Sequence, residues 1–150
     1  ISASCRIGPL MVDAPREMID ALTEYGEFLG LAFQIADDIL DFTGDASTLG
    51  KPVRHDLRER KITLPLIKAL DAAPETERTV ILAILSSQEP SEGDWAQVVD
   101  FVSQYDGVAA AQSAAHEYAA QAQACLQSLP ESVSRTILET AVRLVVERDS

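Results

Sequence analysis

Aromatic residues are scarce in this chain of 150 residues, where Phe, Trp and Tyr together make up 5%. The β-branched residues are scattered, whereas alanine is abundant. Strands favour aromatic and β-branched side chains in an alternating pattern, and alanine is the strongest helix former. The composition therefore argues against a β-sheet protein and makes helical periodicity the pattern to test first.

Basic residues are half as frequent as acidic ones, with 12 Lys and Arg against 24 Asp and Glu, which gives a formal charge of -12 and a pI near 4.4. Such a chain repels the phosphates of nucleic acids and the headgroups of anionic membranes. No apolar run approaches the roughly 18 residues of a membrane span, and the first residues lack the basic-then-apolar order of a secretory signal. We therefore expect a cytoplasmic protein with no nucleic-acid partner and no integral membrane segment.

Cysteine is also rare. Cys5 and Cys125 lie far apart, and neither has a second Cys or a His beside it at the spacing of a zinc finger. Nothing else in the sequence indicates an oxidising compartment, so we expect two unpaired, buried thiols that behave as small hydrophobic side chains.

Apolar residues recur at helical spacing along most of the chain. Pro15 suits the first turn of a helix, and the pattern that follows ends just before Gly44, which predicts one long helix over about 15–43. Shorter helices are predicted over 64–72, 75–86, 94–103 and 108–128, and a last one opens at Pro130. Because no strand-like alternation and no internal repeat occurs, we predict an all-α helical bundle over residues 1–150 as a single segment.

The segment 44–61 departs from this pattern, because it is polar, contains Gly44, Gly50 and Pro52, and is longer than most helix–helix connections. Five of the 12 basic residues lie in its second part: Lys51, Arg54, Arg58, Arg60 and Lys61. In a chain of net charge -12 this is a local reversal of sign. It indicates either a working loop that clamps an anionic group such as a diphosphate, or a solvated loop that pairs with acidic residues of the helices.

A stripe of carboxylates lies near the end of the predicted long helix. At about 100° per residue, Asp37, Asp38 and Asp41 fall within an arc of about 100°, with Gln34 one turn earlier in the same arc, and apolar residues flank the arc on both sides. Two like charges about 4 Å apart repel by roughly 1 kcal/mol in water and by about 4 kcal/mol near a protein surface. Three carboxylates in a cleft therefore indicate a bound cation, and their hard oxygen atoms suit Mg²⁺.

A calcium-binding EF-hand loop is a second interpretation of the acidic residues. Four residues occupy positions 1, 3, 6 and 12 of that motif: Asp45, Ser47, Gly50 and Asp56. Position 5 would be Leu49, which offers no oxygen, and position 12 lacks the bidentate Glu, so we reject this interpretation.

Four successive segments carry a resemblance to a known family: FQIADDILDF at 33–42, GKPV at 50–53, DLRE at 56–59 and KITLPL at 61–66. Together they closely resemble the second aspartate-rich motif, DDxxD, of the trans-polyprenyl diphosphate synthases, the polyprenyl synthetase family, and the loop that follows it. The likeness is strongest over about 24–67 and continues more weakly to the end. It implies the C-terminal part of the all-α isoprenoid synthase fold.

The resemblance implies a Mg²⁺-dependent prenyltransferase that condenses isopentenyl diphosphate with an allylic diphosphate to make longer polyprenyl diphosphates. It implies that Asp37 ligates the metal most directly, and that Asp38 and Asp41 bind metal or its waters. Catalytic roles would fall to Asp37, Asp38 and Lys51, and contacts to substrate would come from Gln34, Lys51, Asp56 and Lys61. Full-length members are commonly homodimers.

The chain departs from the family in two ways. Bacterial members often carry Gly-Asn where this chain has Arg54-His55, and Gly where it has Arg60, so the loop here is bulkier and more basic, and the sequence does not assign these three residues a role. The first aspartate-rich motif of the family would lie before Ile1, and the chain starts in what looks like the middle of a family helix. We therefore expect a truncated or proteolytically shortened chain that does not turn over alone.

Two other functions remain as alternatives. One is a non-catalytic helical partner subunit, or an interaction protein, that retains the fold. Terpene cyclisation on a similar helical fold is disfavoured, because the pattern over 51–65 matches the chain-elongating synthases. Product length is not encoded in the residues present, since the family sets it mainly near its first motif.

Overall fold

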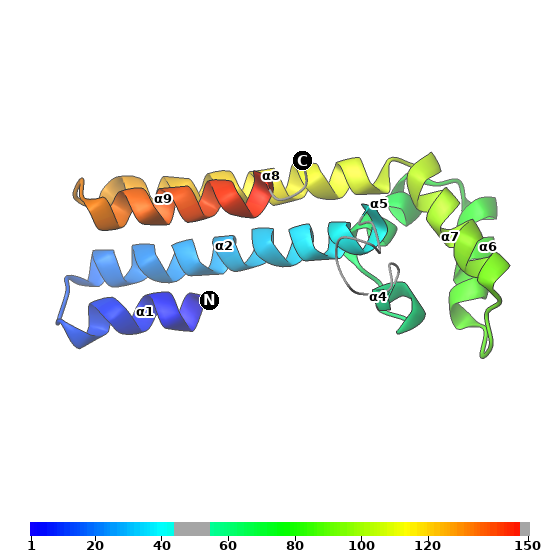
Figure 1. The fold of residues 1–150 in the computed structure, drawn as a ribbon, viewed down its shortest axis with the longest axis horizontal. Helices are drawn as coiled ribbons and strands as arrows, with labels where there is room; N and C mark the ends of the chain where they lie inside the picture. Colours follow the sequence, from blue (N-terminus) through cyan, green and yellow to red (C-terminus); the bar gives the residue numbers. More distant parts are fainter. Residues whose placement is uncertain (44–54, 148–150) are drawn as a thin grey trace. The chain divides into compact units, whose positions relative to one another are not determined.

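The computed structural model describes residues 1–43 and 55–147 of the chain. Within these ranges the regular elements are helices and no strand occurs, which confirms the predicted all-α fold. In chain order they are α1 (Ser2–Met11), α2 (Arg16–Thr43), α4 (His55–Arg58), α5 (Leu64–Ala72), α6 (Glu75–Ser86), α7 (Glu92–Gln104), α8 (Gly107–Cys125), the 3₁₀ helix η1 (Leu126–Ser128) and α9 (Val133–Val146) (Figure 1). None of the helices described is long and apolar enough to cross a membrane.

The chain divides into two compact units. That residues 1–150 form one all-α segment of a larger domain stays a prediction. The first unit combines Ile1–Ala36 with Ser113–Ser150, and the second is Asp37–Gln112. The divisions fall inside α2 and α8, so each of these long helices contributes to both units.

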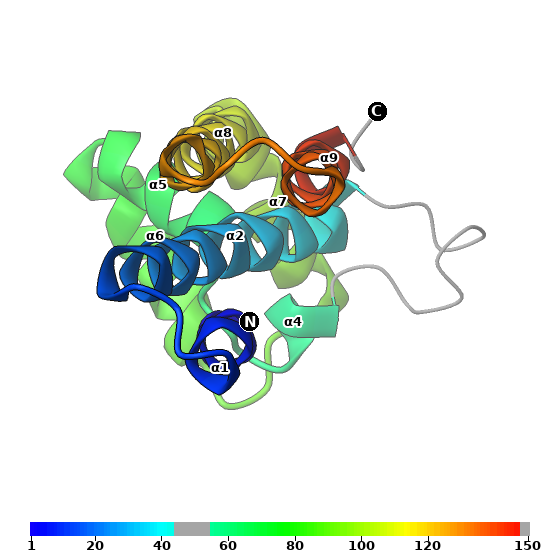
Figure 2. The same cartoon turned by 90° about the vertical axis from the view of Figure 1, so that its left-hand side faces the viewer.

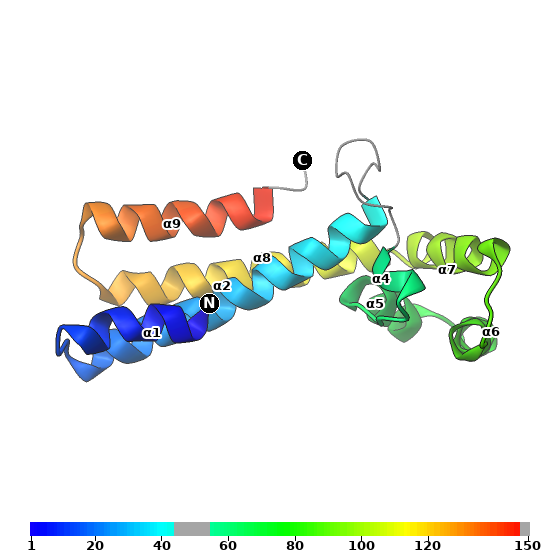
Figure 3. The same cartoon turned by 60° about the horizontal axis from the view of Figure 1, so that its bottom comes forward.

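The first unit is layered around the early part of α2. Its helix α1 lies along one side of α2, and the later part of α8 lies with α9 along the other (Figures 1 and 2). Figure 3 shows α9 running back alongside α8 after the turn at η1. Its buried core consists of Tyr25, Leu29, Ala32, Ala119, Ala122, Leu126 and Val142. Tyr25 is only 1% exposed. Its hydroxyl donates a 3.0 Å hydrogen bond to the Leu138 carbonyl and so connects α2 to α9.

Gly26 allows α1 to approach α2 closely. A Cβ atom at this position would lie 2.8 Å from the Cα of Ser2 and 2.9 Å from the Sγ of Cys5, closer than real side chains pack. Glycine is therefore required here by helix packing. Cys5 and Cys125 are unpaired, as predicted, but each is only partly buried against the core.

The second unit has its own core, in which α7 packs against α5 and α6. Its buried residues include Leu57, Leu66, Ile81, Trp95, Val98 and Phe101. A reciprocal capping box fixes the start of α7, because the Ser91 hydroxyl accepts a hydrogen bond from the Asp94 amide while the Asp94 carboxylate accepts one from the Ser91 amide.

Most helix boundaries agree with the sequence pattern, and the differences have local causes. The ranges predicted for α5 and α6 match those observed. Helix α9 begins at Val133 instead of near Pro130, because the Ser132 side chain caps it through the Arg135 amide. Helix α1 contains Gly8 and Pro9, residues that mark helix breaks in a sequence, and only the family resemblance indicated a helix there.

Candidate functional site

The predicted acidic stripe lies on the last turns of α2. That helix is continuous from Arg16 to Thr43, so Asp37 and Asp41 are one turn apart on the same side, with Asp38 beside them. Asp37 is exposed, whereas Asp38 and Asp41 are half-buried. Gln34 lies one turn earlier on the same helix and is exposed. These carboxylates and this amide are all accessible to a ligand from solvent.

Asp41 connects the end of α2 to α4. Its Oδ2 atom accepts a 3.2 Å hydrogen bond from the backbone N–H of Asp56, a residue 15 positions further along the chain. The next residue, Leu57, is 2% exposed and anchors α4 in the core of the second unit. This anchor and the hydrogen bond together hold Asp56 beside the acidic stripe.

Lys61 follows in the same cluster. Its Nζ atom lies 2.8 Å from Asp56 Oδ1 and 2.8 Å from Glu59 Oε2, and its backbone N–H donates to the Asp56 carbonyl at 2.9 Å. The hydrogen bond to Asp56, followed by the one to Glu59, raises the pKa of Lys61. The side chain is 56% exposed, so a permanently charged ammonium group is presented to solvent next to the carboxylates.

The structure thus brings three of the predicted residues together, Asp41, Asp56 and Lys61, through direct contacts. Asp37, Asp38 and Gln34 lie on α2 with Asp41. The contacts of Lys61 given above are with Asp56 and Glu59 and do not include these three residues. Lys51 and Arg54 lie outside the described residues, as does the side chain of His55. The sequence analysis did not predict Glu59 as a partner of Lys61. The only indication in the sequence was its position two residues before that lysine.

Two of the five basic residues of the loop are used to brace it. Arg58 Nη2 lies 2.8 Å from Glu92 Oε2 at the start of α7, and Arg60 Nη2 donates a 2.6 Å hydrogen bond to the carbonyl of Gln88 between α6 and α7. Arg58 thus pairs with an acidic residue of a helix, as in the second interpretation of the basic loop, whereas Arg60 pairs with a backbone carbonyl instead. Arg60 also has a φ of 61°, a left-handed backbone conformation that favours glycine.

Among the residues that the structure describes, no group of three His, Cys, Asp or Glu side chains could hold a metal ion by itself. Mg²⁺ is usually bound by one or two carboxylates and completes its shell with waters and substrate phosphates. The donors on α2 are accessible carboxylate oxygens, which fit an ion of this kind when it is shared with a diphosphate. The metal ligands stay a prediction.

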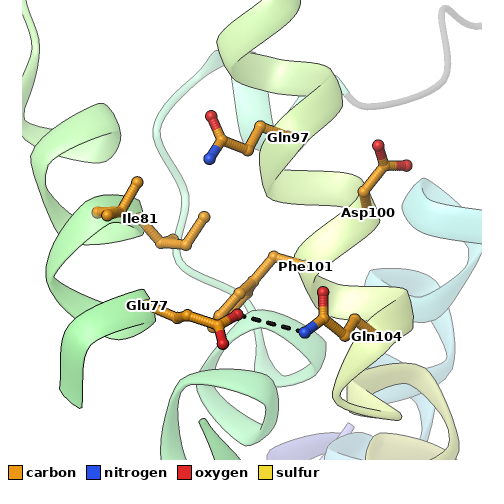
Figure 4. A pocket seen from close by; sticks show the side chains of 7 residues that line it. Glu77, Ile81, Gln97, Asp100, Phe101 and Gln104 are labelled. Atoms are coloured by element: carbon orange, nitrogen blue, oxygen red, sulfur yellow. Dashed lines mark hydrogen bonds between the residues drawn. The ribbon is translucent and has the colours of Figure 1, made fainter. Parts of the chain in front are cut away.

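A hollow of about 170 Å³ lies between α6 and α7, away from these residues. Figure 4 shows Glu77 of α6 directed toward Gln104 of α7, which donates it a 3.2 Å hydrogen bond, with Phe101 beside them. Asp100 also lines the hollow. It is smaller than the roughly 300 Å³ of typical ligand pockets, and its carboxylates repel anions, so it is not a diphosphate site.

Comparison with known proteins identifies the family of this chain. The model of the family described as Polyprenyl synthetase matches residues 1–102. The chain belongs to this family. The polyprenyl synthetase resemblance carried by the four sequence segments is therefore confirmed.

Individual members of the polyprenyl synthetase family match nearly all of this chain. The short chain isoprenyl diphosphate synthase of Methanothermobacter thermautotrophicus is 36% identical over 149 residues, which are 99% of this chain and 45% of that protein. The heptaprenyl diphosphate synthase component 2 of Geobacillus stearothermophilus is 33% identical, with 99% and 45% covered. The chain spans less than half the length of these relatives.

A solved structure supports the fold in the same way. The polyprenyl synthase of Caulobacter crescentus, in a complex with calcium and isoprenyl diphosphate, has a TM-score of 0.88 and 32% identity. The match covers 99% of this chain and 45% of that one.

Proposed function

We propose that this chain forms the metal- and diphosphate-binding wall of a Mg²⁺-dependent prenyltransferase, which condenses isopentenyl diphosphate with an allylic diphosphate to make longer polyprenyl diphosphates. The observation that carries this proposal is the contact series Asp41–Asp56–Lys61 at the end of the acidic stripe. It links Asp41, a carboxylate proposed for the cation, through Asp56 to Lys61, whose ammonium group is proposed for the anion. The complex of the Caulobacter crescentus synthase with calcium and isoprenyl diphosphate supports the same ligand chemistry.

In this proposal Asp37, Asp38 and Asp41 hold Mg²⁺. The bound ion supplies positive charge that stabilises the departing diphosphate. Lys61 donates hydrogen bonds to diphosphate oxygens that the ion does not reach, and Asp56 with Glu59 keeps its ammonium group protonated and oriented.

Two further residues take part in the proposal on sequence grounds. Gln34 contacts the diphosphate side of the site from one turn earlier on α2. Lys51 is a second lysine for the diphosphate and a catalytic residue with Asp37 and Asp38, although it lies outside the described residues.

In the reaction, the allylic C–O bond breaks, the double bond of isopentenyl diphosphate attacks the resulting carbocation, and a proton is lost. Positioning two substrates needs groups on both sides of them. This chain spans less than half the length of its relatives. We therefore propose that, without the rest of such a protein, it binds diphosphate with Mg²⁺ but does not catalyse the condensation. The homodimeric state and the cytoplasmic location of the whole protein stay predictions.

A second candidate is a non-catalytic helical partner subunit. The name of the Geobacillus relative, component 2 of heptaprenyl diphosphate synthase, describes a protein that acts as one component of a synthase, and it fits a catalytic component as well as a non-catalytic one. The two candidates differ in whether the acidic stripe still binds diphosphate with Mg²⁺, as the first requires.

Calorimetric titration of inorganic diphosphate into this chain, with and without Mg²⁺, tests the proposal. We expect binding only with Mg²⁺, and a loss of at least about tenfold in Asp37→Asn, Lys51→Ala and Lys61→Ala, because each removes a charge-assisted contact of about 1.5 kcal/mol. The matched control is Glu17→Gln, which removes an exposed carboxylate more than five turns before Asp37 on α2 and should bind like the wild type. A chain that is helical by circular dichroism but does not bind diphosphate overturns the proposal.

A further inference from the structure

Helix α4 ends in a turn that places Lys61. The Arg60 amide donates a 3.0 Å hydrogen bond to the Leu57 carbonyl, and the Lys61 amide donates a 2.9 Å hydrogen bond to the Asp56 carbonyl. Together with the φ of 61° at Arg60, this pair of bonds forms a Schellman motif, a common ending of a helix. Lys61 directly follows the left-handed residue, so the turn determines where the lysine leaves the helix.

The left-handed position of this motif is usually occupied by glycine, because a Cβ atom is disfavoured there. Here it carries the long side chain of Arg60, whose Nη2 atom donates a 2.6 Å hydrogen bond to the Gln88 carbonyl. Gln88 lies 28 positions further along the chain, in the connection between α6 and α7. Arg60 therefore makes a contact that glycine cannot make, since it joins the turn before Lys61 to a distant part of the second unit.

Arg58 makes a second contact with the same region. Its Nη2 atom lies 2.8 Å from Oε2 of Glu92, the first residue of α7. At about 100° per residue, Arg58 lies about 200° around α4 from Asp56, the carboxylate that contacts Lys61. One side of α4 is thus held by the start of α7, while the other side orients the lysine.

Direct binding of an anion by the arginines is the competing interpretation. A guanidinium group has five N–H donors, so one bond to Gln88 or to Glu92 leaves donors for a phosphate oxygen. The geometry favours a bracing role, because both arginines reach the same part of the second unit and both lie within three residues of Lys61. The two interpretations differ in whether the effect of Arg60 on an anion passes through Lys61.

We propose that Arg60 is a positioning residue of the diphosphate site, which holds the end of α4 against the α6–α7 connection and so fixes the point from which Lys61 reaches a diphosphate. This inference rests on the proposed function, because it concerns how the lysine of that site is held. Without the brace, binding a diphosphate must also order the turn that carries Lys61, and such ordering weakens binding. We expect loss of the brace to lower the affinity for diphosphate by about three- to tenfold.

A double-mutant cycle tests the proposal. The affinity for inorganic diphosphate is measured by calorimetry at a fixed Mg²⁺ concentration in the wild-type chain, Arg60→Gly, Lys61→Ala and the double variant. If Arg60 acts through Lys61, Arg60→Gly weakens binding in the wild-type background and has no further effect once Lys61 is replaced. If Arg60 contacts the diphosphate itself, the same loss appears in both backgrounds, and the proposal is wrong.

Glycine suits the φ of 61°, so Arg60→Gly removes the side chain without adding backbone strain. Arg60→Ala is a second variant, which lacks the side chain and keeps the strain. Both variants should lose affinity by a similar factor, whereas an effect through backbone strain alone would leave the Gly variant with wild-type affinity. Circular dichroism verifies that each variant is folded.

Arg16→Ala is the matched control, because it also removes one positive charge from an exposed arginine, at the start of α2 and more than five turns before Asp37. It should bind diphosphate like the wild type. Wild-type affinity in Arg60→Gly overturns the positioning role and leaves the proposed function standing. A wild-type chain that does not bind diphosphate with Mg²⁺ overturns the proposed function, and this inference with it.

Discussion

The guanidinium of Arg60 donates a 2.6 Å hydrogen bond to the backbone carbonyl of Gln88, although Arg60 itself sits in a left-handed backbone conformation with φ of 61°. The side chain thus holds the residue just before Lys61 against the connection between α6 and α7. A residue with a Cβ atom loses about 1 kcal/mol or more in this conformation relative to glycine. The contact with Gln88 offsets part of that cost.

Replacing Arg60 by Ala and by Gly should separate these two effects. Arg60→Ala loses the hydrogen bond and keeps the backbone strain, whereas Arg60→Gly loses the hydrogen bond and removes the strain. We expect the Gly variant to be more stable than the Ala variant by about 1 kcal/mol, measured by urea unfolding.

Arg58 provides the control, because it lies in α4 with helical geometry and makes an exposed ion pair. There the order should be reversed, with the Ala variant more stable than the Gly variant by about 0.5–1 kcal/mol. An Ala variant at position 60 that is as stable as the Gly variant would show that this backbone is not strained.

Lys61 should report on its two carboxylate partners. Asp56 makes the largest contribution to its raised pKa and Glu59 the next. Removing a negative partner lowers the pKa of an ammonium group, so Asp56→Asn should lower the Lys61 pKa more than Glu59→Gln does. Nuclear magnetic resonance of the Lys61 side chain against pH measures both shifts, and an equal or reversed order contradicts the contact geometry.

The helices were predictable because their determinants are local. The apolar period and the proline near its start located α2 to within about one residue, and Pro74 separated α5 from α6. Helix α7 begins at Glu92, two residues before the predicted start at Asp94. The hydrogen bonds between Ser91 and Asp94 start the helix at residues that carry no apolar pattern. The division into two units has no composition boundary, since it falls within continuous helices.

The site was predictable in its residue types and only partly in its contacts. Carboxylates three and four residues apart must share a helix face, so the stripe on α2 follows from spacing alone. The hydrogen bond between Asp41 and the Asp56 amide joins residues 15 positions apart, and that between Arg60 and Gln88 joins residues 28 apart. Such contacts depend on tertiary packing, which no local spacing encodes.

Gly26 should be intolerant of any side chain. In Gly26→Ala the new methyl group must displace the backbone of Ser2 or the side chain of Cys5, so we expect a loss of about 1–3 kcal/mol in the free energy of unfolding. Gly8→Ala is the control, because a Cβ atom there meets nothing within 4 Å, and alanine in a helix should stabilise by up to about 1 kcal/mol. Thermal unfolding of both variants measures the contrast, and equal melting temperatures would show that α1 and α2 do not pack through Gly26.

Tyr25 should make stability depend on pH in the alkaline range. Burial, with a smaller contribution from Cys5, raises its pKa from 10.0 to about 12. Below about pH 10 the phenol is neutral in both the folded and the unfolded chain. Between pH 10 and 12 it ionises first in the unfolded chain, so its contribution lowers the free energy of unfolding by about 3 kcal/mol.

Tyr25→Phe removes this pH dependence and also the hydrogen bond to Leu138, at a cost of about 1 kcal/mol near neutral pH. The wild type should therefore be more stable at pH 7 and the Phe variant more stable near pH 12, as measured by urea unfolding across this range. A difference between the two proteins that stays constant with pH would mean that Tyr25 ionises equally easily in the folded and unfolded chain.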